Sequence, residues 1–199
     1  MGIQQIPLPS GGVTLAEITS SLPSTSDLIT APKWTHIATY NTNSGTSYTF
    51  SNLSGYNRYR LIFQNFRWNT NSNIEVRANG VTTDSYWQQG LTGTSMATST
   101  IATGSTSWYV GYYQQDYGVP SYGWLEINNA GQAGMKTGSL LINTATSGSS
   151  ADRRRMELAL NLGENTAAIT SLTVFNGSGA TFNFQTDYPN RGIHLMGAN

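Results

Sequence analysis

Two histidines and a few acidic side chains are the groups in this 199-residue chain that could do chemistry. His36 and His194 are the side chains suited to act as bases near neutral pH, and they lie near the two ends of the sequence. Neither histidine belongs to an HxH or HxxxH pattern, whereas a structural or catalytic metal site needs three or four converging ligands. The sequence therefore predicts no metal site, no cofactor and no catalytic histidine.

A pair of carboxylates could hydrolyse a glycan if the two groups were held about 5 to 9 Å apart. The candidates near aromatic residues are Asp84, Asp116, Glu126 and Asp187. Nothing in the sequence brings two of them together, and acids beside turns commonly serve the turn itself. The chain has no GxSxG motif, and its Gly-Ser-Gly stretch at 177–179 lies in a turn between strands, not in a phosphate-binding loop. We therefore expect a protein that is not an enzyme.

The composition restricts the partners of the protein. Charged residues make up 10% of the chain, ten basic against ten acidic, where an average soluble protein has about a quarter. Such a surface attracts no polyanion over a distance, so nucleic acid and acidic membranes are not expected partners. The absence of cysteine excludes disulfides and thiolate metal sites. The first residues lack the pattern of a secretion signal, and no apolar run is long enough to span a bilayer.

Aromatic residues interleaved with glutamine are the most informative feature of the middle third. An aromatic ring stacks on the apolar face of a sugar while amides bond its hydroxyls, so this composition suits glycan binding. It equally suits a protein interface, where Tyr and Trp dominate the binding energy, or simply an aromatic core. The stretch 109–117 exposes rings on both faces of any strand, which predicts a partner beyond one core. The candidate interface or glycan-binding residues are Trp108, Tyr112, Tyr113, Tyr117, Tyr122 and Trp124.

From residue 34 onward the apolar residues recur with a period of two, the pattern of half-buried β-strands. The clearest runs are 59–63, 74–78 and 154–162. Asn79-Gly80 predicts a hairpin turn after the second run, and residues 176–179 predict a turn between two later strands. The Thr- and Ser-rich stretch 91–107 predicts a long loop. About eight or nine short strands separated by turns predict an all-β protein, an antiparallel β-sandwich.

The first 32 residues differ from the rest of the chain. They hold four prolines, a Gly-Gly pair and no aromatic residue, and a capping box at Thr14 and Glu17 predicts one short helix within them. We therefore expect residues 1–32 to be an extended N-terminal anchoring arm and residues 33–199 to be the sandwich knob. The apolar residues of the arm would be buried on a partner: Ile3, Ile6, Leu8, Val13, Leu15, Ile18, Leu22, Leu28 and Ile29.

Three segments of the knob follow one another in the order seen in a known group of proteins. Residues 53–61 read Leu-Ser-Gly-Tyr-Asn-Arg-Tyr-Arg-Leu, residues 74–80 end in Asn-Gly, and a tyrosine follows at position 86. The closing segments are 169–179, with Phe182, and 193–197, where Met196 stands in place of the usual tyrosine. Over about 130 residues this pattern resembles the jelly-roll domains of structural proteins of tailed phages.

The resemblance implies a jelly-roll knob in a virion, made in the host cytoplasm and without an active site. It implies a homotrimeric capsid decoration (cement) protein that stabilises the head, with the arm bound to the major capsid protein or another virion protein. The alternative that it implies is a tail-fibre or receptor-binding tip that recognises a host-surface glycan. In that case the aromatic stretch from 109 to 124 would lie at the exposed end of the knob.

Overall fold

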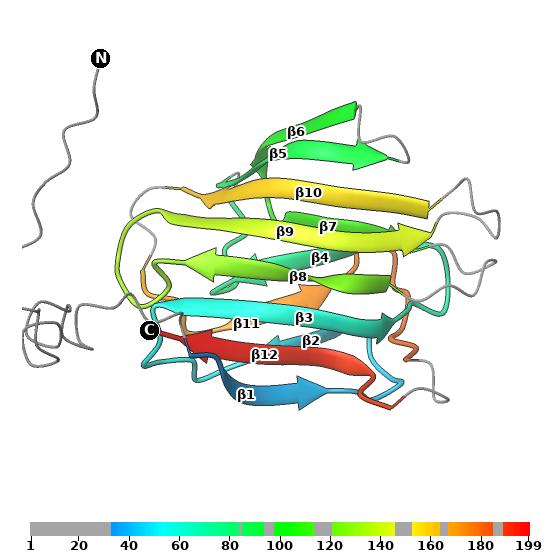
Figure 1. Ribbon diagram of the computed structural model, residues 1–199, viewed down its shortest axis with the longest axis horizontal. Coiled ribbons are helices and arrows are strands. Elements are labelled where there is room, and N and C mark those ends of the chain that lie inside the picture. Colours follow the sequence, from blue (N-terminus) through cyan, green and yellow to red (C-terminus); the bar gives the residue numbers. More distant parts are fainter. Residues whose placement is uncertain are drawn as a thin grey trace, which may run out of the picture. The chain divides into compact units, whose positions relative to one another are not determined.

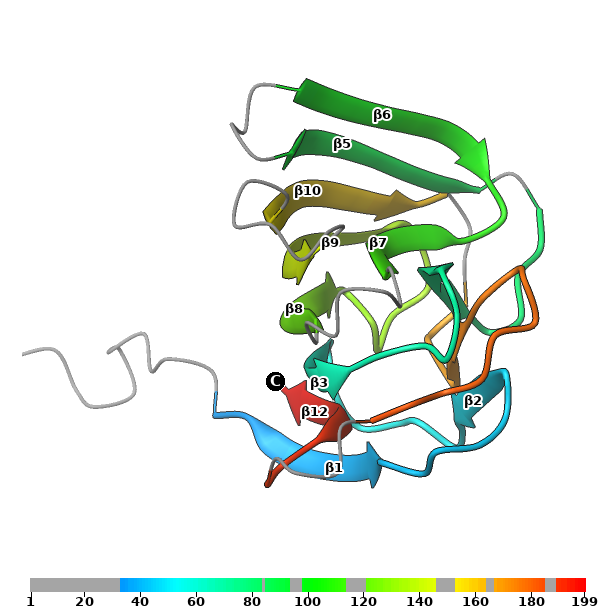
Figure 2. The same ribbon diagram turned by 90° about the vertical axis from the view of Figure 1, so that its right-hand side faces the viewer.

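The computed structural model describes residues 33–83, 85–93, 98–113, 121–145, 153–163, 167–184 and 189–199. Within these ranges the chain forms β-strands and no helix, arranged as two antiparallel sheets that face each other (Figures 1 and 2). The predicted all-β sandwich is confirmed. The predicted arm at 1–32, with its nine apolar residues and its short helix, lies outside the described residues. From Trp34 onward the described residues form one compact unit.

In the described part of the chain, twelve strands make up the two sheets. Their bounds are β1 Thr35–Tyr40, β2 Ser47–Phe50, β3 Arg58–Phe66, β4 Ser72–Ala78, β5 Tyr86–Gly93, β6 Thr98–Ser105, β7 Trp108–Tyr113, β8 Ser121–Asn128, β9 Lys136–Ala145, β10 Arg153–Leu162, β11 Leu172–Phe175 and β12 Gly192–Ala198. The larger sheet has the order β1-β12-β3-β8-β9-β10-β5-β6, and the smaller sheet has the order β2-β11-β4-β7.

The strand pairings are nested along the chain. β1 pairs with β12, β2 with β11, β3 with β8, and β4 with β7. The remaining strands β9, β10, β5 and β6 extend the larger sheet beyond β8, as the upper part of Figure 2 shows. Because the first strand pairs with the last, the nesting brings residues from the two ends of the described chain side by side.

Alternating side chains of both sheets fill the space between them. The inward residues of the runs at 59–63, 74–78 and 156–162 are all buried, so these predicted strands and their inner faces are confirmed. Burial of this continuous apolar surface is the main force that holds the two sheets together. At one end of the sandwich the core is aromatic, because the rings of Phe66, Trp68, Phe182 and Phe184 contact one another.

The turn at Asn79-Gly80 forms, but it does not make the predicted hairpin. Asn79 and Gly80 have positive φ angles of 51° and 65°, as the two central residues of a type I′ turn require. However, β4 pairs with β11 and β7, while the next strand, β5, belongs to the larger sheet. The side chain of Asn79 bonds the backbone of residues 168–171 instead of a partner strand. The turn therefore carries the chain from one sheet to the other.

Two further local predictions were wrong. The stretch 91–107 is not a long loop, because β6 lies within it and pairs with β5 at the edge of the larger sheet. Threonine is β-branched and favours strands, and an edge strand needs no continuous apolar stripe. After the turn at 176–179, Phe182 forms a single bridge with Trp68 and no strand paired with β11. The side chain of Asn176 closes that turn by bonding the backbone of Ser178 and Ala180.

Candidate interaction surface on the larger sheet

The structure separates the predicted aromatic candidates into different environments. Trp108 is fully buried: its ring packs against Tyr86 with centroids 5.1 Å apart, and its Nε1 donates to the Asn161 carbonyl at 3.1 Å. Its prediction as an interface or glycan-binding residue was therefore wrong, because it belongs to the inner face of β7. Tyr112 and Tyr113 are described only as part of the β7 backbone, and Tyr117 lies outside the described residues.

Tyr122 and Trp124 both lie on the outer face of the larger sheet. They are two residues apart on β8, and successive side chains of a strand point to opposite faces, so they share the face opposite the buried Leu125. Tyr122 is 43% exposed, and its hydroxyl donates to Oδ1 of Asn65. Trp124 is half-buried. These two of the six predicted candidates are available to a partner.

Trp124 is the centre of an apolar row that crosses three strands. Ile62 on β3 lies directly opposite Trp124, and Trp124 lies directly opposite Leu141 on β9. Directly opposed side chains on neighbouring strands have Cβ atoms about 5 Å apart, so the three form a continuous strip. All three are half-buried and point away from the core. We call Ile62, Trp124 and Leu141 the outer row.

The same face carries a further exposed ring, which is not among the six predicted candidates. Trp87 on β5 is 51% exposed, and Leu91 on the same strand is 42% exposed. Buried Tyr86 and Gln88 flank Trp87 and put it on the outer face, but because Gln88 is polar, β5 has no apolar alternation that would indicate this from the sequence. The outer face of the larger sheet therefore presents apolar and aromatic side chains over several strands.

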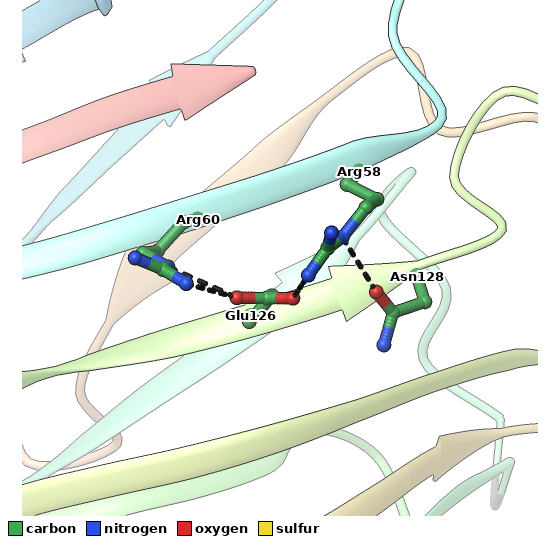
Figure 3. A network of polar contacts seen from close by, with 4 residues as sticks. All are labelled: Arg58, Arg60, Glu126 and Asn128. Atoms are coloured by element: carbon green, nitrogen blue, oxygen red, sulfur yellow. Dashed lines mark hydrogen bonds and ion pairs between the residues drawn. The ribbon is translucent and has the colours of Figure 1, made fainter. Parts of the chain in front are cut away.

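A charged cluster lies beside the outer row (Figure 3). Glu126 on β8 accepts a hydrogen bond from Nη2 of Arg58 on one carboxylate oxygen and, at 3.0 Å, from Nε of Arg60 on the other. Arg58 also donates from Nε to Oδ1 of Asn128 at 3.0 Å. The side chain of Glu126 is only 7% exposed although it points to the outer face. Two arginines thus share one buried carboxylate.

Trp34 covers this cluster from the N-terminal side of β1. The guanidinium carbon of Arg60 lies 4.2 Å from the centroid of the Trp34 ring and 5.1 Å from that of Trp124, and Arg58 lies 5.3 Å from Trp34. Cation–π contacts of this kind are attractive, most of all where water is excluded. Since β12 lies between β1 and β3, the side chain of Trp34 reaches across β12. Because the β1–β12 pairing is long-range, no local pattern in the sequence indicates this contact.

The electrostatics of the cluster favour an ionised carboxylate. Burial alone would raise the pKa of Glu126, but the hydrogen bonds and positive charges of Arg58 and Arg60 outweigh burial and hold this pKa below its usual value. One negative charge against two positive charges leaves the cluster with an excess of one positive charge. Its polar groups are largely bonded to one another, which makes it a rigid border of the outer row.

Of the four candidate acids, Glu126 is the one that lies within the described residues. Asp84, Asp116 and Asp187 lie outside the described residues. Among the described residues no three His, Cys, Asp or Glu side chains gather in a way that could hold a metal ion. In the same part of the chain, no helix has the length and apolar character needed to cross a bilayer. No model of a known protein family matches this chain, and no curated protein matches its sequence.

Proposed function

We propose that this protein is a non-enzymatic structural component of a tailed-phage virion, a homotrimeric decoration protein of the capsid. The observation that carries the proposal is the outer row on the larger sheet, because it offers a partner an apolar and aromatic strip. Paired strands fix the backbone beneath these side chains, and the Arg–Glu cluster fixes one border. A binding surface built on rigid elements of this kind suits permanent assembly.

The nested pairings support the resemblance to phage jelly rolls. Apart from β5, β6, β9 and β10, eight strands remain, and they pair first with last, second with second-last, and so on inward. A jelly roll is one long hairpin rolled into two sheets, and its strands pair in this nested way. We therefore interpret the sandwich as a jelly roll whose larger sheet has been widened by four added strands.

In this proposal the outer row forms the contact between copies of the chain, and residues 1–32 form the contact with the capsid. The outer row is buried between copies of the knob, at a gain of about 25 cal/mol for each Å² of apolar surface. Residues 1–32 anchor the trimer to the major capsid protein or to another virion protein. Three anchors on one trimer bind with high avidity even if each binds weakly, because the second and third attach at high effective concentration.

Leu141→Asp is expected to dissociate the trimer into folded monomers. Leu141 is half-buried in the free knob, so the new carboxylate remains solvated there, but it would lose its water in an interface between copies. Sedimentation analysis gives the mass, and circular dichroism checks the fold. Asn143→Asp is the matched control, because it adds the same charge two residues along the same face of β9 and should leave the trimer intact. A trimeric Leu141→Asp protein would refute the role of the outer row.

Deletion of residues 1–32 is expected to leave a folded trimer that no longer decorates the particle. The remaining chain keeps the twelve strands and the core that the structure describes. The measurement is occupancy on phage particles made without this protein, counted by electron microscopy after addition of full-length or truncated chain. If the truncated trimer decorated heads at full occupancy, the anchoring role of the segment would be wrong even if the trimer itself were correct.

A second candidate function is a tail-fibre tip that binds a host glycan. The exposed rings of Trp87 and Tyr122, with amide side chains such as Gln89 and Asn143 on the same face, favour this alternative. A glycan array and host-cell binding by the full-length protein separate the two candidates. A decoration protein gives no saturable signal in either assay, whereas a receptor-binding tip gives both and loses them in Trp87→Ala.

A further inference from the structure

His36 and His194, which lie near opposite ends of the sequence, point at the same hydroxyl group. Nε2 of His36 lies 2.8 Å from Oγ1 of Thr39, and Nδ1 of His194 lies 2.8 Å from that same oxygen. The two ring centroids are 6.3 Å apart, and the group is open to solvent. The pairing of β1 with β12 therefore brings two imidazole nitrogens to a common point on the outer face of the larger sheet.

A bulge in β1 creates this convergence. His36 and Thr39 are three residues apart, so in a regular strand they would point to opposite faces. The register moves from His36 opposite Met196 to Ala38 opposite Leu195, which makes Ile37 an extra residue. Because of the extra residue, Thr39 points to the same face as His36. There it lies directly opposite His194 on β12. Bulges that redirect a side chain in this way are over-represented next to active sites.

Hydrogen bonding also fixes the proton on one of the rings. Nε2 of His194 lies 3.1 Å from the carbonyl oxygen of Asn190, and because a carbonyl only accepts, Nε2 must carry the hydrogen. In the neutral ring this leaves a lone pair on Nδ1, directed at Thr39. Histidines that bind metals have this arrangement, in which a backbone carbonyl holds one ring N–H and the other nitrogen is the ligand.

We propose that His36 and His194 form a binding site for a divalent transition-metal ion of the zinc, nickel or copper type. Small rotations of the two rings replace their hydrogen bonds to Thr39 with bonds of about 2.0–2.1 Å to the ion. His36 then binds through Nε2 with its proton on Nδ1, and His194 binds through Nδ1 with its proton on Nε2. Imidazole nitrogens suit these ions, whereas magnesium and calcium prefer oxygen.

The site has two protein ligands, and water completes the coordination. Within the described residues no third His, Cys, Asp or Glu side chain joins the pair, so the affinity will be modest compared with a closed four-ligand site. The ion would link β1, the outermost strand of the larger sheet, to its neighbour β12. Since the unfolded chain holds the two histidines far apart, the ion binds the folded state and stabilises it.

Titration calorimetry of the full-length protein with zinc chloride or nickel chloride tests the proposal. The expected result is one ion bound per chain, with a higher thermal unfolding midpoint when the metal is present. His36→Gln and His194→Gln should each weaken binding by at least about tenfold and abolish the shift in midpoint. Thr39→Val is the matched control: it removes the hydroxyl, keeps both ligands and should still bind the ion.

Each outcome bears on the proposal directly. His36 is exposed, so the His36→Gln protein should fold. If the His194→Gln protein does not fold, the affinity of His36→Gln for the ion tests the proposed site by itself. Equal affinity of the unaltered chain and His36→Gln would place the ion elsewhere and overturn the assignment. Failure of the unaltered chain to bind either metal saturably would overturn it as well. The unaltered chain, without any tag, should also be retained on immobilised nickel, and His36→Gln should not.

Discussion

Replacement of Trp108 by alanine is expected to lower the free energy of unfolding by about 3–5 kcal/mol, the largest effect of any substitution considered for this protein. The side chain is fully buried between the sheets, its ring packs edge-on against Tyr86, and its indole N–H bonds the Asn161 carbonyl. The substitution removes a large apolar volume and takes the indole N–H donor away from the partly buried Asn161 carbonyl. Urea unfolding followed by circular dichroism measures the change.

Trp87→Ala is the matched control for this experiment. Trp87 lies on the outer face, is 51% exposed, and its loss should change the free energy of unfolding by about 0.5 kcal/mol or less. The two tryptophans therefore differ in burial and not in residue type. If both variants were equally stable, the assignment of Trp108 to the core would be wrong. Trp108 would then again be a candidate interface residue.

Glu126→Gln is expected to destabilise the protein at neutral pH by about 2 kcal/mol. Glutamine keeps the shape of the side chain but loses the charge that balances Arg58 and Arg60. The side chains of the two arginines are 31% and 29% exposed, so water compensates part of the loss. For this reason the effect stays below that of breaking a fully buried ion pair.

The pH dependence of this difference follows from the lowered pKa of Glu126. Because its pKa in the folded protein lies below the usual value of 4.5, the stabilisation is fully present above that value. It is lost as the pH falls further, through the lower pKa of the folded state, where the carboxylate takes up a proton. Unfolding curves of the unaltered protein and Glu126→Gln should therefore differ at pH 7 and converge in acid.

Glu157→Gln is the control for the acid series. Glu157 lies on the same face and contacts Arg155 at 3.3 Å, but its side chain is 60% exposed. An exposed pair of this kind contributes little, so we expect a change of about 0.5 kcal/mol or less. A Glu126→Gln protein that was as stable as the unaltered chain at pH 7 would show that the arginines are solvated well enough without their carboxylate.

The local features of the fold could be predicted from the sequence, and the long-range ones could not. Alternation of apolar and polar residues identified the strands around Leu61, Val76 and Leu158 and the faces that they bury, since this period depends only on neighbouring residues. Threonine-rich β6 lacks that alternation, and for this reason the sequence predicts a loop in its place. The pairing of strands far apart in the sequence leaves no local trace, so the Asn79-Gly80 turn was read as a hairpin.

The candidate surface was predicted in part for the same reason. Tyr122 and Trp124 were recognised by type and lie on an accessible face, whereas Trp108 has the same chemistry and is buried. Composition cannot tell the two faces of a strand apart unless the strand's inner residues are known. The contact of Trp34 with Arg58 and Arg60 and the approach of His36 to His194 both depend on the long-range pairing of β1 with β12, which no local pattern in the sequence reveals.

The nested pairing also determines when the molecule can be completed during synthesis. Thr39 on β1 and His194 on β12 lie 155 positions apart in the sequence. At a translation rate of about 5–20 residues per second, β12 is therefore synthesised roughly 10–30 s after β1. Until then β3 has only β8 beside it, and the edges that β12 will cover remain open to other nascent chains. Closure of the larger sheet is therefore a late event, and a polypeptide that ends before β12 leaves one edge of β3 uncovered, where other chains can pair with it.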